Sequence, residues 1–245
     1  MKFIFDKMNF NDENEIETTL QELISKDDFK IIDYIDDSII IEYCLNHDVI
    51  DIDDYINSDE TLLIHASYNG LTEMVKMLFK FRPNIELKSK RFNCTPLICA
   101  SKRNHVEIIK LLLSQGANID NPDREGTTPL MYACMGNNYN AIKLLLERGA
   151  NHYIKNINGN SALIYACEMC MLNSVQLLLD YGANLNTKNK QDMTPLMCAT
   201  EFCNVDVIEA LLMLNMKVSD KRKALKIATR IKCKRAMKML FESLR

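Results

Sequence analysis

Apolar and polar positions follow a pattern that returns about every 33 residues along most of the chain. Five segments share an initial Thr or Ser, an apolar run and a final Ala, and they span residues 61–66, 95–100, 128–133, 161–166 and 194–199. Their first residues are 34, 33, 33 and 33 positions apart. A polar turn and a second apolar stretch, such as residues 108–113, follow each segment. This pattern predicts a pair of helices in every unit.

The residues that border these segments suit helix ends. Thr or Ser caps the first helix of each unit, and in three units Pro follows at the first helical position. Gly116, Gly149 and Gly182 supply the left-handed conformation that ends the second helix. Arg82 and Asn215 replace this Gly in the first and fifth units, and the Pro after Arg82 predicts a distorted loop. Asp and Gly before the next Thr predict a hairpin-like loop.

A single helix pair cannot bury its own apolar stripe, whereas stacked pairs can, at roughly 1.5–3 kcal/mol for each fully buried Leu or Ile. The period and the openings of the units resemble the ankyrin repeat, whose signature is Thr-Pro-Leu-His-x-Ala on a period of about 33 residues. The resemblance covers residues 57–219 and implies an all-α ankyrin-repeat solenoid of stacked helix-turn-helix units with short hairpin loops. The five repeats lie at about 61–93, 95–126, 128–159, 161–192 and 194–219.

The chain departs from the family signature at its His. This position holds Ile64, Ile98, Met131, Ile164 and Met197. We therefore expect apolar packing to replace the polar network that the His makes between repeats.

The two ends of the chain depart further from the repeat. Residues 26–35 resemble residues 47–56 at an offset of 21, which predicts a degenerate helical capping region over 1–56, with two helix pairs in 13–56. Residues 220–245 keep the apolar pattern with a shortened loop, and they predict a basic capping helix pair whose last helix spans about 234–243. Divergent, polar ends are expected of a solenoid.

Composition limits the class of protein. Hydrophobic residues make up 47% and charged residues 26%, which is typical of a soluble globular protein. The apolar start of the chain stops at Asp6, too early for a signal peptide, and no apolar run approaches the ~18 residues of a membrane span. The nine cysteines are odd in number and lie in apolar helical patterns, so we expect reduced thiols. These features predict a cytoplasmic protein, and basic residues 221–223 and 232–235 allow nuclear entry.

The resemblance implies that the chain binds other macromolecules on a concave face made by loop tips and the exposed side of each first helix. Candidate binding residues at the tips are Arg91, Phe92, Arg124, Ile157 and Lys190, and those on the helices are Tyr68, Lys102, Arg103, Met135, Met169 and Phe202. The large apolar members suit the centre of an interface, or else they pack against the next repeat. Lys90, Arg91, Lys102 and Arg103 form a basic cluster that either receives an acidic stripe of a partner or is a solvated face.

Motifs for catalysis, cofactors and metals are not evident. The sequence holds no Gly-rich phosphate loop, no His-Glu-x-x-His and no Gly-x-Ser-x-Gly, so we expect no enzyme and no cofactor. Cys167 and Cys170, with Cys134 and Cys203 in neighbouring units, invite a zinc site. Stacked units lie roughly 10 Å apart, whereas zinc needs every sulfur at about 2.3 Å, so we expect no metal. His105 lies at the turn between two helices, where the resemblance implies a structural role.

The net charge of −3 is a cancellation along the chain. Residues 1–60 carry 18 acidic and 4 basic residues, a net charge of −14, while residues 61–220 carry +2 and residues 221–245 carry +9. We expect a monomer that binds a protein partner, and the opposite charges of its ends allow end-to-end association at low salt. The alternative is that the basic C-terminal region binds nucleic acid or an acidic partner surface. Nucleic acid is the less favoured partner, because lysines that solubilise a terminal cap explain the same charge.

Overall fold

The computed structural model describes residues 38–46, 50–56, 59–214 and 216–245. Within these residues the backbone forms helices and turns, with one isolated bridge between Tyr55 and Thr61 as the only strand-like pairing. The helix pairs expected over 13–56 lie largely outside the described residues, and so does Asn215. No described helix combines the length and the apolar character that crossing a membrane requires.

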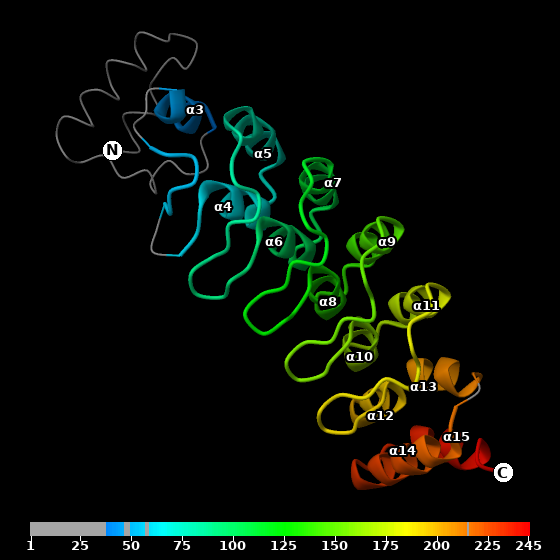
Figure 1. Ribbon diagram of the computed structural model, residues 1–245. Helices are drawn as coiled ribbons and strands as arrows, with labels where there is room; N and C mark the ends of the chain where they lie inside the picture. The colour runs from blue at the N-terminus through cyan, green and yellow to red at the C-terminus, as the bar shows by residue number, and fades with distance from the viewer. Residues whose placement is uncertain (1–37, 47–49, 57–58, 215) are drawn as a thin grey trace, which may run out of the picture.

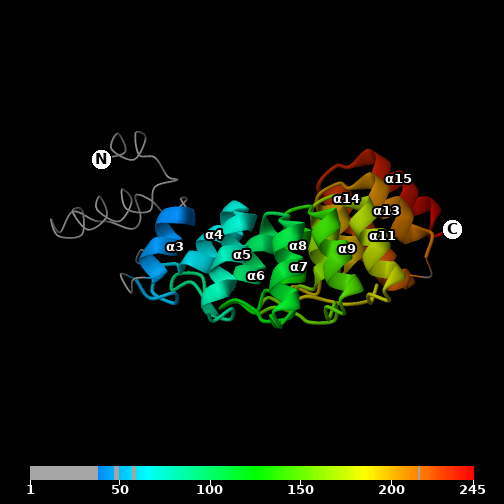
Figure 2. The ribbon, with the colours of Figure 1, turned by 90° about the horizontal axis from the view of Figure 1, so that it is seen from above.

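The helices form two layers that run the length of an arc (Figures 1 and 2). The inner layer holds α4 (Leu62–Asn69), α6 (Pro96–Lys102), α8 (Pro129–Met135), α10 (Ala162–Glu168), α12 (Pro195–Glu201) and α14 (Val218–Arg230). The outer layer holds α3 (Ser38–Asn46), α5 (Thr72–Leu78), α7 (Val106–Ser114), α9 (Tyr139–Glu147), α11 (Leu172–Asp180), α13 (Val205–Leu212) and α15 (Lys234–Glu242). The fold is therefore the stacked α-solenoid that the period predicts.

The ends of the helices have the expected local chemistry. The inner helices α4 to α12 each begin after a Thr or Ser whose side-chain oxygen accepts the backbone N–H three residues on, at 3.2–3.4 Å. Gly116, Gly149 and Gly182 have φ between 86° and 90°, in the left-handed region. Arg82 also takes the left-handed conformation, at φ 54°, after the short 3₁₀ helix η2 (Phe79–Phe81).

The core lies between the two layers and continues from repeat to repeat. The five residues that replace the signature His are at most 2% exposed, which confirms that apolar packing takes over at this position. A buried Leu or Ile is worth roughly 1.5–3 kcal/mol, so many such positions sustain the stack without a polar centre.

Several neighbouring repeats are nevertheless joined by polar contacts at a different place, the last residue of the turn, directly before the outer helix. The His105 ring nitrogen Nε2 lies 3.1 Å from the carbonyl oxygen of Tyr68 in the preceding repeat. Asn138 donates from Nδ2 to the carbonyl oxygens of Ser101 and Lys102, 2.9 Å each. Asn204 donates in the same way to repeat four, whereas Met171 at the equivalent position is buried and apolar. His105 thus has the structural role that the resemblance implies.

The expectation that all cysteines are reduced is wrong for one pair. Cys203 and Cys233 form a disulfide between repeat five and the C-terminal helix pair, with their Cα atoms 6.0 Å apart. Cys233 occupies the same linking position as His105 and Asn138, directly before an outer helix. The pairing arises because two different units are stacked, and a residue-by-residue view of the sequence does not reveal it. The other seven cysteines are free, and of these Cys170 alone is exposed.

Candidate functional site: the concave surface

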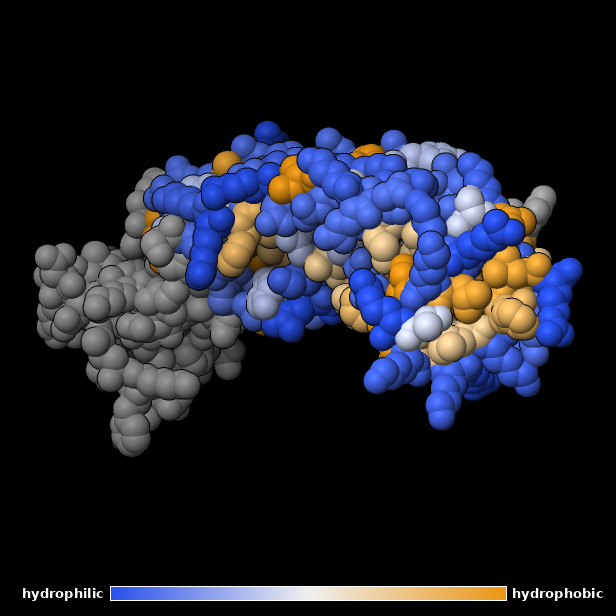
Figure 3. Space-filling model, turned by 90° about the horizontal axis from the view of Figure 1, so that it is seen from below, coloured by the Kyte–Doolittle hydropathy of each residue, from blue (hydrophilic) through white to orange (hydrophobic). Residues whose placement is uncertain are grey.

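The inner helices and the hairpin loops line the inner side of the arc, which we call the concave surface (Figure 1). Five of the six large apolar candidates are exposed here: Phe92 at 57%, Met135 at 39%, Ile157 at 54%, Met169 at 45% and Phe202 at 58%. They come from repeats one, three, four and five, so exposed apolar residues recur along one side of the solenoid. In the space-filling view of Figure 3, hydrophobic residues lie in separate areas among hydrophilic ones.

Tyr68 differs from the other apolar candidates because it is partly buried. The guanidinium of Arg103 lies 4.3 Å from the centre of its ring and donates from Nη2 to the Tyr68 hydroxyl at 2.6 Å. The two residues come from neighbouring repeats, so this contact also ties repeat two to repeat one. The hydroxyl and one face of the Tyr68 ring are therefore occupied by Arg103.

The hairpin loops are held in place by their neighbours. The backbone N–H groups of Lys90, Ile157 and Lys190 donate to carbonyl oxygens of the preceding hairpin at 2.8–2.9 Å. Inside the third hairpin, the buried Asp123 accepts from the N–H groups of Glu125 and Thr127 at 2.8 and 2.7 Å. Side chains at the tips therefore project from a backbone that is fixed before any partner arrives.

One depression has a volume of about 420 Å³ and lies between the second hairpin and helices α4, α6 and α8. We call it the N-terminal groove. It brings together four of the sequence-predicted residues: Tyr68, Phe92, Lys102 and Met135. Tyr132 and Cys99 also line it, although neither is among the residues expected to bind a partner. Their place in the sequence pattern could have indicated them, because both occupy the fifth position of the segment that opens a repeat.

Each cation of the basic cluster lies over an aromatic ring. Lys90 Nζ is 4.0 Å from the centre of the Tyr55 ring, and Lys102 Nζ is 5.6 Å from that of Tyr132. Arg91 lies 4.9 Å from the Phe92 ring, in addition to the contact of Arg103 with Tyr68. Burial, the largest cause, and a hydrogen bond to Asp123 raise the pKa of Tyr132 well above its usual range, so this ring stays neutral. Attraction to the ring faces fixes the positive charges on this part of the concave surface.

A second depression of about 380 Å³, the C-terminal groove, lies near repeats four and five and contains Phe202. Arg230 of α14 donates to both carboxylate oxygens of Glu201 at its rim, at 2.5 and 2.6 Å. Burial raises the pKa of the Glu168 carboxyl, and it raises that of the Cys198 thiol to about 12. This groove therefore presents paired charges beside its exposed phenylalanine, unlike the N-terminal groove.

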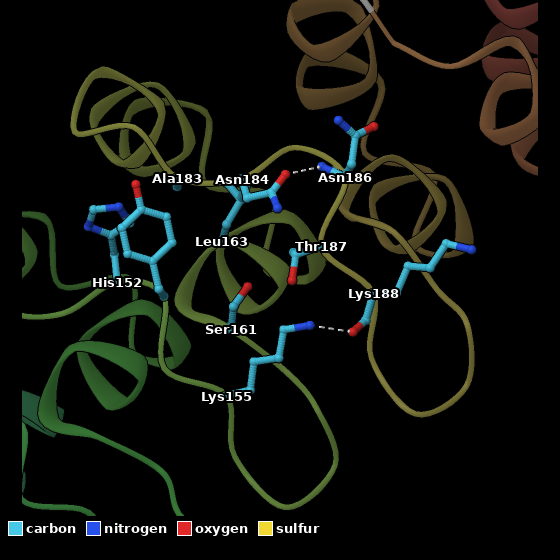
Figure 4. A pocket seen from close by; sticks show the side chains of 10 residues that line it. His152, Lys155, Ser161, Leu163, Ala183, Asn184, Asn186, Thr187 and Lys188 are labelled. Atoms are coloured by element: carbon cyan, nitrogen blue, oxygen red, sulfur yellow. Dashed lines mark hydrogen bonds between the residues drawn. The ribbon is translucent and has the colours of Figure 1, made fainter.

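The third depression, of about 360 Å³, contains none of the eleven candidate residues (Figure 4). Its polar groups are largely occupied by the chain itself: Lys155 donates from Nζ to the Lys188 carbonyl at 2.9 Å, and the Asn186 N–H donates to Asn184 Oδ1 at 2.9 Å. His152 Nε2 is buried without a hydrogen-bond partner.

The remaining candidates are separate points on the same surface. Arg124 donates from Nη2 to the Lys90 carbonyl at 3.2 Å, beside the N-terminal groove, while Ile157, Met169 and Lys190 are exposed and line none of the three depressions. The cysteines considered for zinc are not gathered at one point: Cys134 and Cys167 are buried, and Cys203 is held in the disulfide. The described residues contain no group of three His, Cys, Asp or Glu side chains suited to a metal ion.

These features define a class of protein, a helical-repeat solenoid with an exposed, mixed apolar and basic inner surface. The family model for ankyrin repeats, which describes three copies, matches residues 63–156, 121–189 and 149–222. The chain therefore belongs to the ankyrin repeat family, whose members generally mediate protein–protein interactions. A comparison with curated proteins gave no match.

Proposed function

We propose that the chain is a non-enzymatic binding module, a scaffold or masking adaptor, which captures a partner protein on its concave surface. The observation that carries this proposal is the series of exposed apolar side chains, Phe92, Met135, Ile157, Met169 and Phe202, on a rigid backbone. Exposed apolar area of this kind is unfavourable in water unless a partner covers it. Aromatic and Met side chains beside Arg are the residues enriched at interface centres.

The experiment starts from a display library of random peptides selected on the intact chain, which yields defined ligands. Their affinities are then measured for a triple variant, Phe92→Ser, Met135→Ser and Phe202→Ser. We expect the variant to lose most of the binding, because the anchors of the interface are removed together. Circular dichroism at 222 nm and the melting temperature should stay close to those of the unaltered chain, since all three side chains are exposed.

The matched control changes three exposed apolar residues of the outer layer: Tyr139→Ser, Tyr181→Ser and Met213→Ser. These side chains are 40%, 41% and 79% exposed and lie on or at the ends of α9, α11 and α13. The control should bind the selected peptides as the unaltered chain does. Equal binding by the concave-surface variant, or loss of binding by the control, would place the interface elsewhere.

The basic C-terminal helix pair is a weaker candidate for binding nucleic acid. Two of its cations already neutralise acids of repeats four and five: Lys223 lies 2.5 Å from Asp192, and Arg230 pairs with Glu201. A salt titration decides this alternative, since phosphate contacts produce affinity that falls steeply with salt. We expect no binding of duplex DNA or oligothymidylate at about 50 mM salt, and strong binding there would favour the alternative.

A further inference from the structure

We propose that the N-terminal groove binds an extended acidic segment of a partner protein, in which one large apolar side chain lies between two groups of carboxylates. This inference rests on the proposed function, because it assigns the chemistry of the partner to one part of the concave surface. It is carried by the apolar middle of the groove and by the cations beside it: Lys102 lines the groove, while Lys90 and Arg91 lie on its hairpin and Arg103 follows Lys102.

The middle of the groove is apolar. Its floor includes Ile64 of α4 and Ile98 of α6, which the structure otherwise buries to 1% and 0% exposure. Phe92 and Met135 stand at its rim with much of their surface in water. A single Leu, Ile, Met or Phe of a partner would cover these rim side chains and lose its own contact with water.

Two of the cations come before α6 in the chain and two lie at its C-terminal end. Lys90 and Arg91 precede the helix on the second hairpin, and Lys102 and Arg103 occupy its C-terminal end. α6 has 7 residues and is on the order of 10 Å long, so a partner segment that reaches the cations before and after it must span at least this length. An extended peptide advances about 3.3 Å per residue, so at least three residues lie between its two groups of carboxylates, and the apolar anchor is one of them.

These cations are free to receive carboxylates. None of the four forms an ion pair with a carboxylate of the described residues, in contrast to Lys223 and Arg230 of the C-terminal pair. Their contacts with aromatic rings restrict them in advance, so less freedom is lost when a partner binds. A planar Arg can also bind a carboxylate through two parallel hydrogen bonds.

An acidic peptide fits this groove better than a single-stranded nucleic acid does. Nucleic acids bind such surfaces by stacking bases on aromatic faces, and a cation lies over the ring of Tyr68, Phe92 and Tyr132 alike. Asp59 and Glu60 also line the groove and repel a continuous phosphate backbone. The same two acids repel carboxylates as well, so the proposed peptide needs its carboxylates beside the four cations and away from Asp59 and Glu60.

The test uses a fluorescein-labelled synthetic peptide with the core Glu-Glu-Ser-Leu-Ser-Glu-Glu, and anisotropy reports its binding to the full chain at about 50 mM salt. Three comparison probes replace the Leu by Ser, replace all Glu by Lys, or substitute oligothymidylate of similar length. We expect the acidic peptide with Leu to bind most tightly and to weaken as salt rises. Equal binding of the Lys peptide or of the peptide without Leu would overturn the inference, and tighter binding of oligothymidylate would assign the groove to nucleic acid instead.

A pair of charge reversals locates the site. Lys102→Glu with Arg103→Glu should weaken the acidic peptide by more than about tenfold, and Lys102→Gln with Arg103→Gln should weaken it less, in line with the smaller charge change. The control is Lys110→Glu with Lys143→Glu, an equal charge change on outer helices α7 and α9, where both lysines pair with glutamates of their own helix. The control should alter affinity less than about twofold.

The outcomes separate this inference from the proposed function. If library-selected peptides depend on Phe92, Met135 and Phe202 but lack acidic residues and tolerate the reversal at Lys102 and Arg103, the concave surface binds partners and the acidic chemistry is wrong. If selected peptides bind independently of those three apolar residues, the proposed function fails. Equal binding of the acidic peptide to both charge-reversed variants would refute the assignment to this groove.

Discussion

The polar link between repeats two and three provides a direct test of how the solenoid is held together. Asn138 donates to the carbonyl oxygens of Ser101 and Lys102 at the C-terminal end of α6, both at 2.9 Å. These carbonyls are among the groups that a helix end leaves without partners inside the helix. In Asn138→Ala both hydrogen bonds are lost, and at about 1 kcal/mol net for each the free energy of unfolding should fall by about 2 kcal/mol.

The Asn138 side chain makes no capping hydrogen bond to its own helix α9, so this loss reports on the link between repeats. Urea denaturation followed by circular dichroism at 222 nm measures the free energy of unfolding. The melting temperature should also fall by about 4–8 °C for a chain of this size. The control is Asn140→Ala in the same helix, because Asn140 is exposed and should change stability by less than about 0.5 kcal/mol. An Asn138→Ala variant as stable as this control would show that the link contributes nothing.

Further predictions concern the disulfide, a left-handed glycine, an exposed carboxylate and the ends of the solenoid. A denaturing thiol titration of oxidised protein should find seven free cysteines and the reduced protein nine, while nine in both would exclude the disulfide between Cys203 and Cys233. Gly70→Ala should destabilise the chain more than Gly116→Ala: both glycines have positive φ, but a Cβ on Gly70 would lie 2.5 Å from the His105 ring, whereas one on Gly116 meets nothing within 4 Å. Denaturation curves of the two variants make this comparison, and equal losses would contradict the contact. Hydrogen bonds from Lys188 and then Lys223 lower the pKa of Asp192 to about 2, so carboxyl NMR should find it ionised at pH 3, and Lys223→Gln should raise that pKa. Because the pKa of Asp192 is lower in the folded chain, its contacts with Lys188 and Lys223 stabilise the fold above about pH 4. This contribution disappears as pH falls toward 2. Sedimentation should show self-association at about 10 mM salt that disappears at about 150 mM, and no change with salt would argue against end-to-end contact.

The repeat register made most of the fold predictable from sequence. Thr or Ser at the start of each inner helix and Gly116, Gly149 and Gly182 after outer helices are local signals, because a cap or a left-handed turn depends on one or two residues. The same register places residues about 33 positions apart next to each other in space. It therefore identified the tip and helix positions that the structure finds exposed, including Phe92 and Phe202.

What the sequence left open depends on side-chain geometry between units. Arg103 could extend into water or fold onto Tyr68, and the choice depends on a ring 35 positions earlier. Cys203 and Cys233 come from units joined by a shortened loop, so the usual spacing does not align them. The polar network was expected to be absent because the signature His is missing, yet His105, Asn138 and Asn204 provide one at the turn. A pattern of residue types indicates which positions meet but not which contacts form between them.

Hydrogen–deuterium exchange of the chain with and without a library-selected peptide is the most direct test of the concave surface as the binding site. We expect protection in the hairpins and inner helices, with exchange slowed at residues 90–102 and 124–135 and unchanged in the outer helices at 106–114 and 139–147. Protection confined to the outer helices, or to the C-terminal pair at 218–242, would contradict it.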